Sequence, residues 1–319
     1  MKKIILLLAL SASVSCYLFS CKKEKTVSTT TTIPAGPYTS MNDIFSALRL
    51  EPKVLTVDAS IGGSFYGNSG TRYIFNANSF QNASGVTITG NIQIQVCEYI
   101  QKGDMIFSKM LPISNGEPLI SGGEISIAAT QNGLPVYLKR NNRFEAHIPT
   151  NGTPSTGMEL FRGRMAEDTA TAITNWVLPE LDSMAKLRIG VFTYPNQDTF
   201  NIISDSLILA NADRFMTSPD YQNFTVTPII EGDTMPSKNV FGYTIYDNFK
   251  GVWPLSSYMN KVFTENHVPN IPVHFAVFTL MNGNFYGGTL GTIPVSGSNY
   301  TVSLKKVDAN TFKAQLNEM

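Results

Sequence analysis

The sequence is poor in the residues and motifs that most catalytic and metal-binding proteins share. Its 319 residues include only three cysteines and three histidines. His267 and His274 lie close in sequence, but without paired cysteines or a third ligand nearby a zinc site is not expected. The signatures Gly-x-Ser-x-Gly and His-Glu-x-x-His are missing, as is a glycine-rich phosphate loop before Lys-Ser or Lys-Thr. We therefore expect no metal and no cofactor.

A long hydrophobic run is also missing. The apolar stretch of residues 4–10 is too short for a membrane-spanning helix, which needs roughly 20 apolar residues. Because it follows Lys2 and Lys3 and precedes small and polar residues, it predicts an export signal over residues 1–20. The chain has 24 basic and 24 acidic residues, so removal of these two lysines leaves 22 basic residues. Without a basic excess, we expect no nucleic acid partner.

The end of this export signal resembles a bacterial lipobox, in the order Leu18, Phe19, Ser20 and Cys21. The resemblance implies cleavage before Cys21 and lipidation of its thiol, which would anchor the chain to a membrane. Cys16 is a weaker competing site, because no leucine lies three residues before it. Lys22 differs from the aspartate that retains some lipoproteins at the inner membrane, so the outer membrane is the expected location. Whether the chain would face the periplasm or the exterior stays open.

A segment with little to bury follows the expected anchor. Residues 21–40 are rich in threonine, serine and proline, which predicts a disordered tether. Ser40 and Asp43 have the spacing of a capping box, which predicts that a helix begins after Ser40. The apolar residues that follow are spaced for one face of such a helix: Ile44, Phe45 and Leu48.

From residue 54 onward, β-branched and aromatic runs alternate with turns at about ten-residue spacing, which is typical of β-sandwiches. Asn132-Gly133 and Asn282-Gly283 predict tight hairpin turns. We predict an all-β chain with two Ig-like β-sandwich domains in tandem and short peripheral helices. The domains are expected at residues 41–157 and 201–319, with a connecting segment at residues 158–200.

Several short motifs look like a family of uncharacterised lipoproteins from Bacteroidetes. They occur in this order: Gly62-Gly63, Gly70-Thr71, Asn78-Ser79-Phe80, Val86-Thr87-Ile88-Thr89-Gly90, Glu98, Asp104-Met105-Ile106, Ser121-Gly122-Gly123, Met158-Glu159-Leu160-Phe161-Arg162-Gly163 and Asn211-Ala212-Asp213-Arg214-Phe215. The first half is also loosely similar to the β-sandwich module of ankyrins and netrin receptors. The resemblance implies a fold and a place in the cell envelope, and it implies no activity.

Two groups of residues are candidates for ligand binding. Asp213 and Arg214 form an adjacent acid and base, which indicates either a site for a polar ligand or a structural ion pair or capped turn. Tyr243, Tyr246 and Trp253 lie in an aromatic-rich segment, which indicates either a surface that stacks on sugars or proteins, or ordinary strand packing. The two tyrosines should fall on opposite faces of a strand, so one of them could be exposed.

Three functions are compatible with these features. The leading hypothesis is a lipid-anchored, noncatalytic binding or scaffold module of the cell envelope, with a glycan or an envelope protein as its partner. The second is a carboxylate-dependent glycoside hydrolase, because two acidic residues can be brought together by a fold without any motif in the sequence. The third is a purely structural envelope component. The absence of catalytic motifs favours a protein that is not an enzyme.

Overall fold

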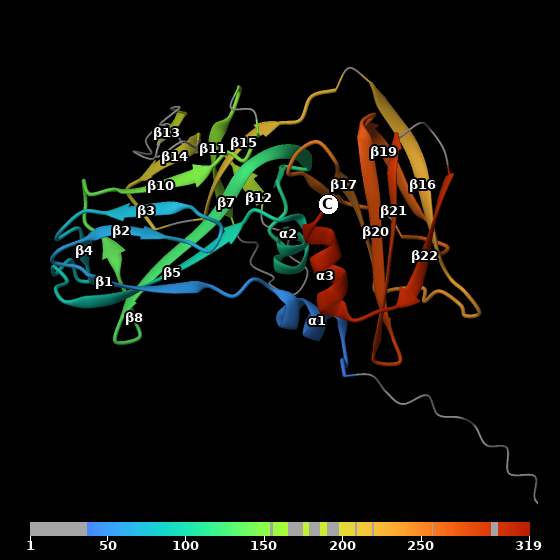
Figure 1. The fold of residues 1–319 in the computed structure, drawn as a ribbon, viewed down its shortest axis with the longest axis horizontal. Helices are drawn as coiled ribbons and strands as arrows, with labels where there is room; N and C mark the ends of the chain where they lie inside the picture. Colours follow the sequence, from blue (N-terminus) through green and yellow to red (C-terminus); the bar gives the residue numbers. More distant parts are fainter. Residues whose placement is uncertain are drawn as a thin grey trace, which may run out of the picture. The chain divides into compact units, whose positions relative to one another are not determined.

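The computed structural model describes residues 37–153, 156–164, 175–178, 186–189, 198–207, 209–218, 220–256, 258–294 and 299–319. The expected export signal, Cys21 and the tether up to residue 36 lie outside the described residues. The described residues form 22 strands and three short helices (Figure 1). The prediction of an all-β chain with short helices is therefore confirmed. None of the described helices has the length and apolar character needed to cross a membrane.

The largest sheet has eight strands, in the order β1-β5-β7-β15-β11-β12, with β6 and β8 paired to β7. These strands are β1 (Lys53–Asp58), β5 (Asn91–Tyr99), β6 (Ile113–Ser114), β7 (Glu117–Gln131), β8 (Leu134–Pro135), β11 (Glu159–Arg164), β12 (Asn175–Val177) and β15 (Leu209–Phe215). The hairpin predicted at Asn132-Gly133 joins β7 to β8. Its residues have φ angles of 52° and 79°, as a tight turn of this kind requires.

A second sheet has five strands, in the order β13-β14-β10-β3-β2. They are β2 (Gly63–Tyr66), β3 (Arg72–Phe75), β10 (Phe144–Pro149), β13 (Lys186–Ile189) and β14 (Thr199–Ser204), and a small separate sheet pairs β4 (Phe80–Gln81) with β9 (Tyr137–Leu138). One core cluster joins this sheet to the first: Ile92, Ile94 and Val96 of β5 are buried with Phe75, Phe144 and Phe200. From residue 91 to residue 97, the alternation in β5 therefore buries every second side chain.

The third sheet has seven strands, in the order β18-β17-β20-β21-β22-β16-β19. They are β16 (Tyr221–Ile230), β17 (Val240–Tyr246), β18 (Val252–Pro254), β19 (Phe263–Pro269), β20 (Pro272–Met281), β21 (Asn284–Pro294) and β22 (Asn299–Lys306). All pairs in it are antiparallel except β16 with β22. Asn282 and Gly283, with φ angles of 49° and 71°, form the predicted hairpin turn between β20 and β21.

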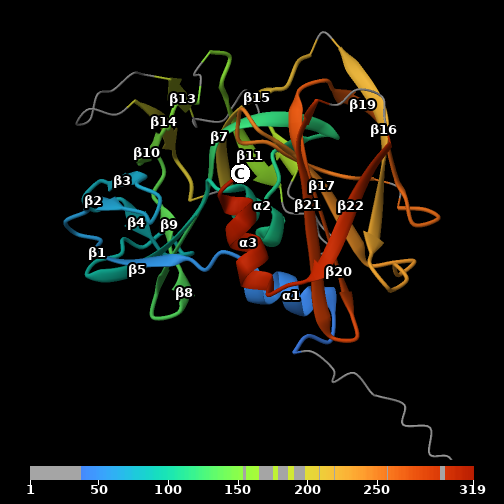
Figure 2. The same ribbon diagram turned by 45° about the vertical axis from the view of Figure 1, so that its right-hand side comes forward.

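Three helices lie against one face of the third sheet: α1 (Met41–Leu48), α2 (Lys102–Ser108) and α3 (Ala309–Asn317). Their apolar side chains share a second core cluster with residues of β17, β20 and β21, among them Ile245, Phe278 and Phe285. Figures 1 and 2 show α2 and α3 between this sheet and the strands of the first half of the chain. The predicted helix after Ser40 is confirmed as α1, whereas α2 has no counterpart in the sequence prediction.

The pairing of the strands contradicts the predicted domain boundaries. β15 lies inside the predicted second domain, yet it pairs with β7 and β11 of the first sheet. β14 pairs with β10, and the predicted connecting segment itself supplies β11, β12 and β13. The boundary prediction is therefore wrong, because alternation marks where strands occur but not which distant strands they pair with. Residues 35–319 form one compact unit.

Candidate functional site

The α1 helix forms one wall of a groove whose other wall is the third sheet. Its first turn is fixed by the predicted capping box: Ser40 Oγ accepts a hydrogen bond from the Asp43 amide, and the Asp43 carboxylate accepts one from the Ser40 amide. These hydrogen bonds, together with those from Thr39, lower the pKa of Asp43. The capped helix buries Ile44 and Phe45 on one side and leaves Asn42 exposed on the other. The wall that α1 forms is therefore positioned by residues that are close together in the sequence.

The opposite wall belongs to the third sheet. β17 presents Phe241 and Tyr243, and the Asn282-Gly283 turn closes one end of the groove. Between the two aromatic residues, Gly242 leaves room for Leu255, whose Cδ1 would lie 2.8 Å from an added Cβ. A larger side chain at position 242 would therefore displace Leu255, which also lines the groove.

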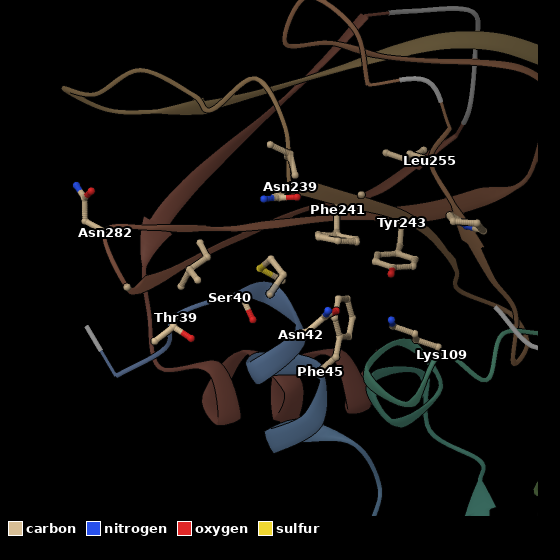
Figure 3. Close-up of a pocket in the computed structure, with 16 residues that line it drawn as sticks. Thr39, Ser40, Asn42, Phe45, Lys109, Asn239, Phe241, Tyr243, Leu255 and Asn282 are labelled. Atoms are coloured by element: carbon tan, nitrogen blue, oxygen red, sulfur yellow. The ribbon is translucent and has the colours of Figure 1, made fainter. Parts of the chain in front are cut away.

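The two walls enclose a groove of about 720 Å³, which we call the α1 groove. Its core is aromatic: the Phe45 ring meets the Phe241 ring edge-on with centroids 5.1 Å apart. Phe241 and Tyr243 each stack on Phe278, with centroids 5.8 Å apart. Figure 3 shows Phe241 and Tyr243 on the sheet side, with Phe45 facing them from α1. The rings thus support one another, and Phe241 stays half-buried at the groove.

Polar groups surround the aromatic floor of the α1 groove. Asn42, Asn239 and Asn282 are all exposed and line it, together with Thr39 and Ser40 (Figure 3). Lys109, from the end of α2, places its Nζ 4.8 Å from the centroid of the Phe45 ring, a distance typical of a cation–π contact. No acidic residue is among the described residues that line the groove. It therefore combines flat apolar rings with hydrogen-bonding groups and one cation.

Tyr246 and Trp253 line a different and smaller pocket of about 310 Å³, together with Tyr221 and Met216. Tyr246 is only 1% exposed, and its ring stacks on Phe249 with centroids 5.1 Å apart. Burial raises the pKa of the Tyr246 phenol, and the charge of Glu265 raises it further. The phenol hydroxyl is buried without a hydrogen-bond partner among the described residues.

Asp213 belongs to a buried polar network and lines none of the three pockets described for this chain. Asn211 donates hydrogen bonds from Nδ2 to the carboxylates of Asp213 and Glu124, the latter at 3.2 Å. All three residues are fully buried, and burial raises the pKa of both carboxyl groups. Lys250 reaches this network from the loop between β17 and β18 and donates from Nζ to the Gly122 carbonyl at 3.2 Å.

The five candidate residues are thus not brought together in one site. Asp213 and Arg214 are neighbours within β15, so their side chains point to opposite faces and Arg214 remains partly exposed. Tyr243 lines the α1 groove and is 6% exposed, so neither tyrosine is an exposed surface residue. Phe45, Asn42 and Lys109 were missed as site residues. The capping box predicted the helix that carries Asn42 and Phe45, but no signal in the sequence links that helix to Lys109 or to residues near position 241.

Acidic residues do gather at a third pocket of about 230 Å³, lined by Glu51, Glu98 and Asp104. The two oxygens of Glu98 accept hydrogen bonds from the backbone amides of Ser69 and Thr71, at 2.8 and 3.0 Å. Asp104 forms an ion pair with Lys313 at 2.7 Å. Glu98 and Asp104 therefore serve contacts within the fold.

Comparisons with known proteins assign no family to this chain. No family model matches it, and no curated protein matches it. One solved structure, a pilus-presented adhesin, aligns with 7% sequence identity over 80% of this chain and 94% of the adhesin chain. The TM-score of that alignment is 0.15, a value at which the likeness carries no argument about fold or function.

Proposed function

We propose that this protein is a lipid-anchored, noncatalytic module of the cell envelope that binds a glycan in the α1 groove. The anchor rests on the lipobox-like residues that end in Cys21, and Lys22 favours the outer membrane. The resemblance to Bacteroidetes lipoproteins agrees with a location in the cell envelope. The tether would join the anchor to Ser40, so the groove would lie close to the point where the folded part begins.

The chemistry of the α1 groove is the observation that carries the glycan proposal. Sugar rings have an apolar C–H face and a rim of hydroxyl groups, so they suit a site with aromatic rings and surrounding amides. Phe45, Phe241 and Tyr243 supply the rings. Exposed asparagine amides both donate and accept hydrogen bonds, as sugar hydroxyls do. A volume of about 720 Å³ lies within the usual range for small-ligand sites.

A binding role is better supported than hydrolysis. A glycosidase needs two carboxyl groups at the scissile bond, one of them with a raised pKa. Glu124 and Asp213 have raised pKa values, but both side chains are fully buried. The described lining of the α1 groove contains no carboxyl group at all. Neither Glu124 nor Asp213 lines any of the three pockets described above, so neither is placed to act on a substrate bound there.

We also propose that the three larger sheets group into two sandwich-like layers of tandem Ig-like type, with corrected boundaries. The first would use the strands between residues 53 and 215, and the second those between residues 221 and 306. The strand pairing supports this grouping, because the strands of the third sheet pair only with one another among the described strands.

The glycan proposal is tested by probing the full chain, held in a non-ionic detergent, against an array of bacterial and plant oligosaccharides. Asn42→Ala removes one exposed amide from the groove and should weaken binding roughly threefold to tenfold, the usual effect of one hydrogen bond. Alanine favours helix, so α1 should stay folded. Asn310→Ala, at an exposed position of α3 outside the groove, is the matched control and should leave binding unchanged. Failure of every glycan to bind would refute the proposal.

A further inference from the structure

We propose that a second pocket binds a small ligand with a quaternary ammonium group. We call it the Trp253 pocket, and its lining includes Glu117, Met216, Tyr221, Tyr246, Trp253 and Asn266. It shares no lining residue with the α1 groove, so binding here would be independent of the proposed glycan binding. Its volume of about 310 Å³ is near the lower limit for small-ligand sites and suits one compact group.

Aromatic side chains from three strands of the third sheet contribute to the wall of the Trp253 pocket. Trp253 of β18 and Tyr221 at the start of β16 are half-buried, whereas Tyr246 of β17 is 1% exposed. Stacking on Phe249 fixes the Tyr246 ring, with centroids 5.1 Å apart. Aromatic rings attract cations to their π faces, and the indole of tryptophan does so most strongly. A wall of this composition therefore favours a cationic ligand.

The charge of the lining also favours a cation. Glu117 is the one charged residue among the described residues that line the pocket, and it is exposed. Among the described residues, none forms an ion pair or a side-chain hydrogen bond with Glu117. The Asn115-Gly116 turn, with φ angles of 50° and 84°, leads directly into Glu117. Two hydrogen bonds of 2.8 and 3.0 Å to Asn175 of β12 hold this turn, so the carboxylate has a fixed base.

The scarcity of hydrogen-bond acceptors indicates which kind of cation fits. A primary ammonium group carries three N–H donors, and each donor that is buried without an acceptor is costly. Glu117 and Asn266 offer acceptors in the described lining, but both residues are exposed. A quaternary ammonium group has no N–H donor. Its methyl groups can instead contact apolar side chains such as those of Met216 and Val268, which are buried in the lining.

Matched ligands test the charge and the methyl groups separately. Choline and its neutral carbon analogue, 3,3-dimethylbutanol, have the same shape, whereas ethanolamine has the charge without the methyl groups. Calorimetry on the full chain in non-ionic detergent measures the three affinities. We expect choline to bind about tenfold more tightly than either analogue. Glycerophosphocholine forms a further arm: affinity equal to that of choline would indicate a lipid headgroup as the source, and weaker affinity would indicate a free ligand.

Variants then assign the preference to this pocket. Glu117→Gln keeps the size of the side chain and should weaken choline binding about threefold, the usual effect of an exposed ion pair, without changing the affinity for 3,3-dimethylbutanol. Trp253→Leu should reduce the preference for choline over 3,3-dimethylbutanol to below about threefold. The ratio of the two affinities does not depend on the folded fraction, so it remains valid if this variant is less stable. Glu231→Gln, at an exposed position outside the pocket, is the matched control and should change neither affinity.

Several results would overturn the proposal. Equal affinity for choline and 3,3-dimethylbutanol would mean that the charge contributes nothing. Tighter binding of ethanolamine than of choline would exclude a site for quaternary ammonium groups. A preference for choline that survives both Glu117→Gln and Trp253→Leu would place the cation elsewhere on the molecule. Absence of binding for all four ligands would refute the proposal and leave glycan binding in the α1 groove unaffected.

Discussion

Replacement of Lys250 by methionine should raise the free energy of unfolding at neutral pH and lower it at high pH. Lys250 is largely buried, and burial lowers its pKa from 10.5 to about 8. A shift of this size corresponds to about 3 kcal/mol of destabilisation whenever the lysine is charged in the folded state, at 1.36 kcal/mol per pKa unit. The unfolded chain binds more protons than the folded chain between pH 8 and 10.5, so the free energy of unfolding should rise with pH in this window.

Methionine removes this penalty and also the hydrogen bond to the Gly122 carbonyl, which contributes about 1 kcal/mol. Burial raises the pKa of Asp213, so this carboxyl group can take up a proton when the cation is removed. At pH 7, the free energy of unfolding of Lys250→Met should therefore exceed that of the parent chain by about 2 kcal/mol. At about pH 10 and above, the parent chain should be the more stable of the two.

The assay is denaturant unfolding of both chains at several pH values from 6 to 10.5, followed by far-UV circular dichroism. Lys250→Arg is the control: arginine stays charged throughout this range, so it keeps the penalty of a buried cation and should show no gain at high pH. A Lys250→Met chain that is less stable than the parent at pH 7, with an unchanged pH profile, would refute the reasoning.

Three further predictions use other parts of the molecule. Tyr246→Phe removes a buried hydroxyl without a described partner, so the free energy of unfolding should stay constant or rise by up to about 1 kcal/mol; a clear loss would show that the hydroxyl is bonded. Cys21→Ala should abolish labelling by a fatty acid analogue while Cys16→Ala retains it, and label kept in the first variant would disprove the assigned anchor. Residues 41–157 alone lack β11, β14 and β15, so they should not melt cooperatively; a sharp transition by circular dichroism would contradict the pairing.

Local features of the fold could be predicted from the sequence because neighbouring residues decide them. The capping box at Ser40 depends on residues three apart, and the two Asn-Gly turns depend on backbone angles that these residues adopt easily. The pairing of β15 with β7 depends instead on a close approach of distant strands. At Gly122, an added Cβ would lie 2.7 Å from the Ala212 carbonyl oxygen, a constraint that becomes visible only when both strands are in place.

The residues of the α1 groove could likewise be predicted from the sequence only in part. Tyr243 could be recognised as an aromatic candidate. The prediction that Tyr243 and Tyr246 lie on opposite faces of the strand is confirmed, because they belong to different core clusters. Phe45 comes from a helix about 200 positions earlier in the sequence, and Lys109 from the unpredicted helix α2. The short α2 contains a glycine and begins without a side-chain cap, so its sequence carries no helix signal of the kind that marks α1.

Two largely buried lysines connect the third sheet to the first half of the chain, and they do so in opposite directions. Lys102 of α2 donates to the Tyr246 carbonyl of β17, and Lys250 donates to the Gly122 carbonyl of β7. Burial lowers the pKa of each to about 8, so neither charge stabilises the fold at neutral pH. Each long side chain nevertheless reaches particular oxygen atoms, those of Tyr246 and Met319 for Lys102 and that of Gly122 for Lys250, whereas an apolar side chain would accept many neighbouring positions. We infer that the lysines fix how the halves meet. A chain with Lys102→Met and Lys250→Met should then be more stable at pH 7 but show faster amide hydrogen exchange in β7 and β17 than in β20, and uniformly unchanged exchange would refute this role.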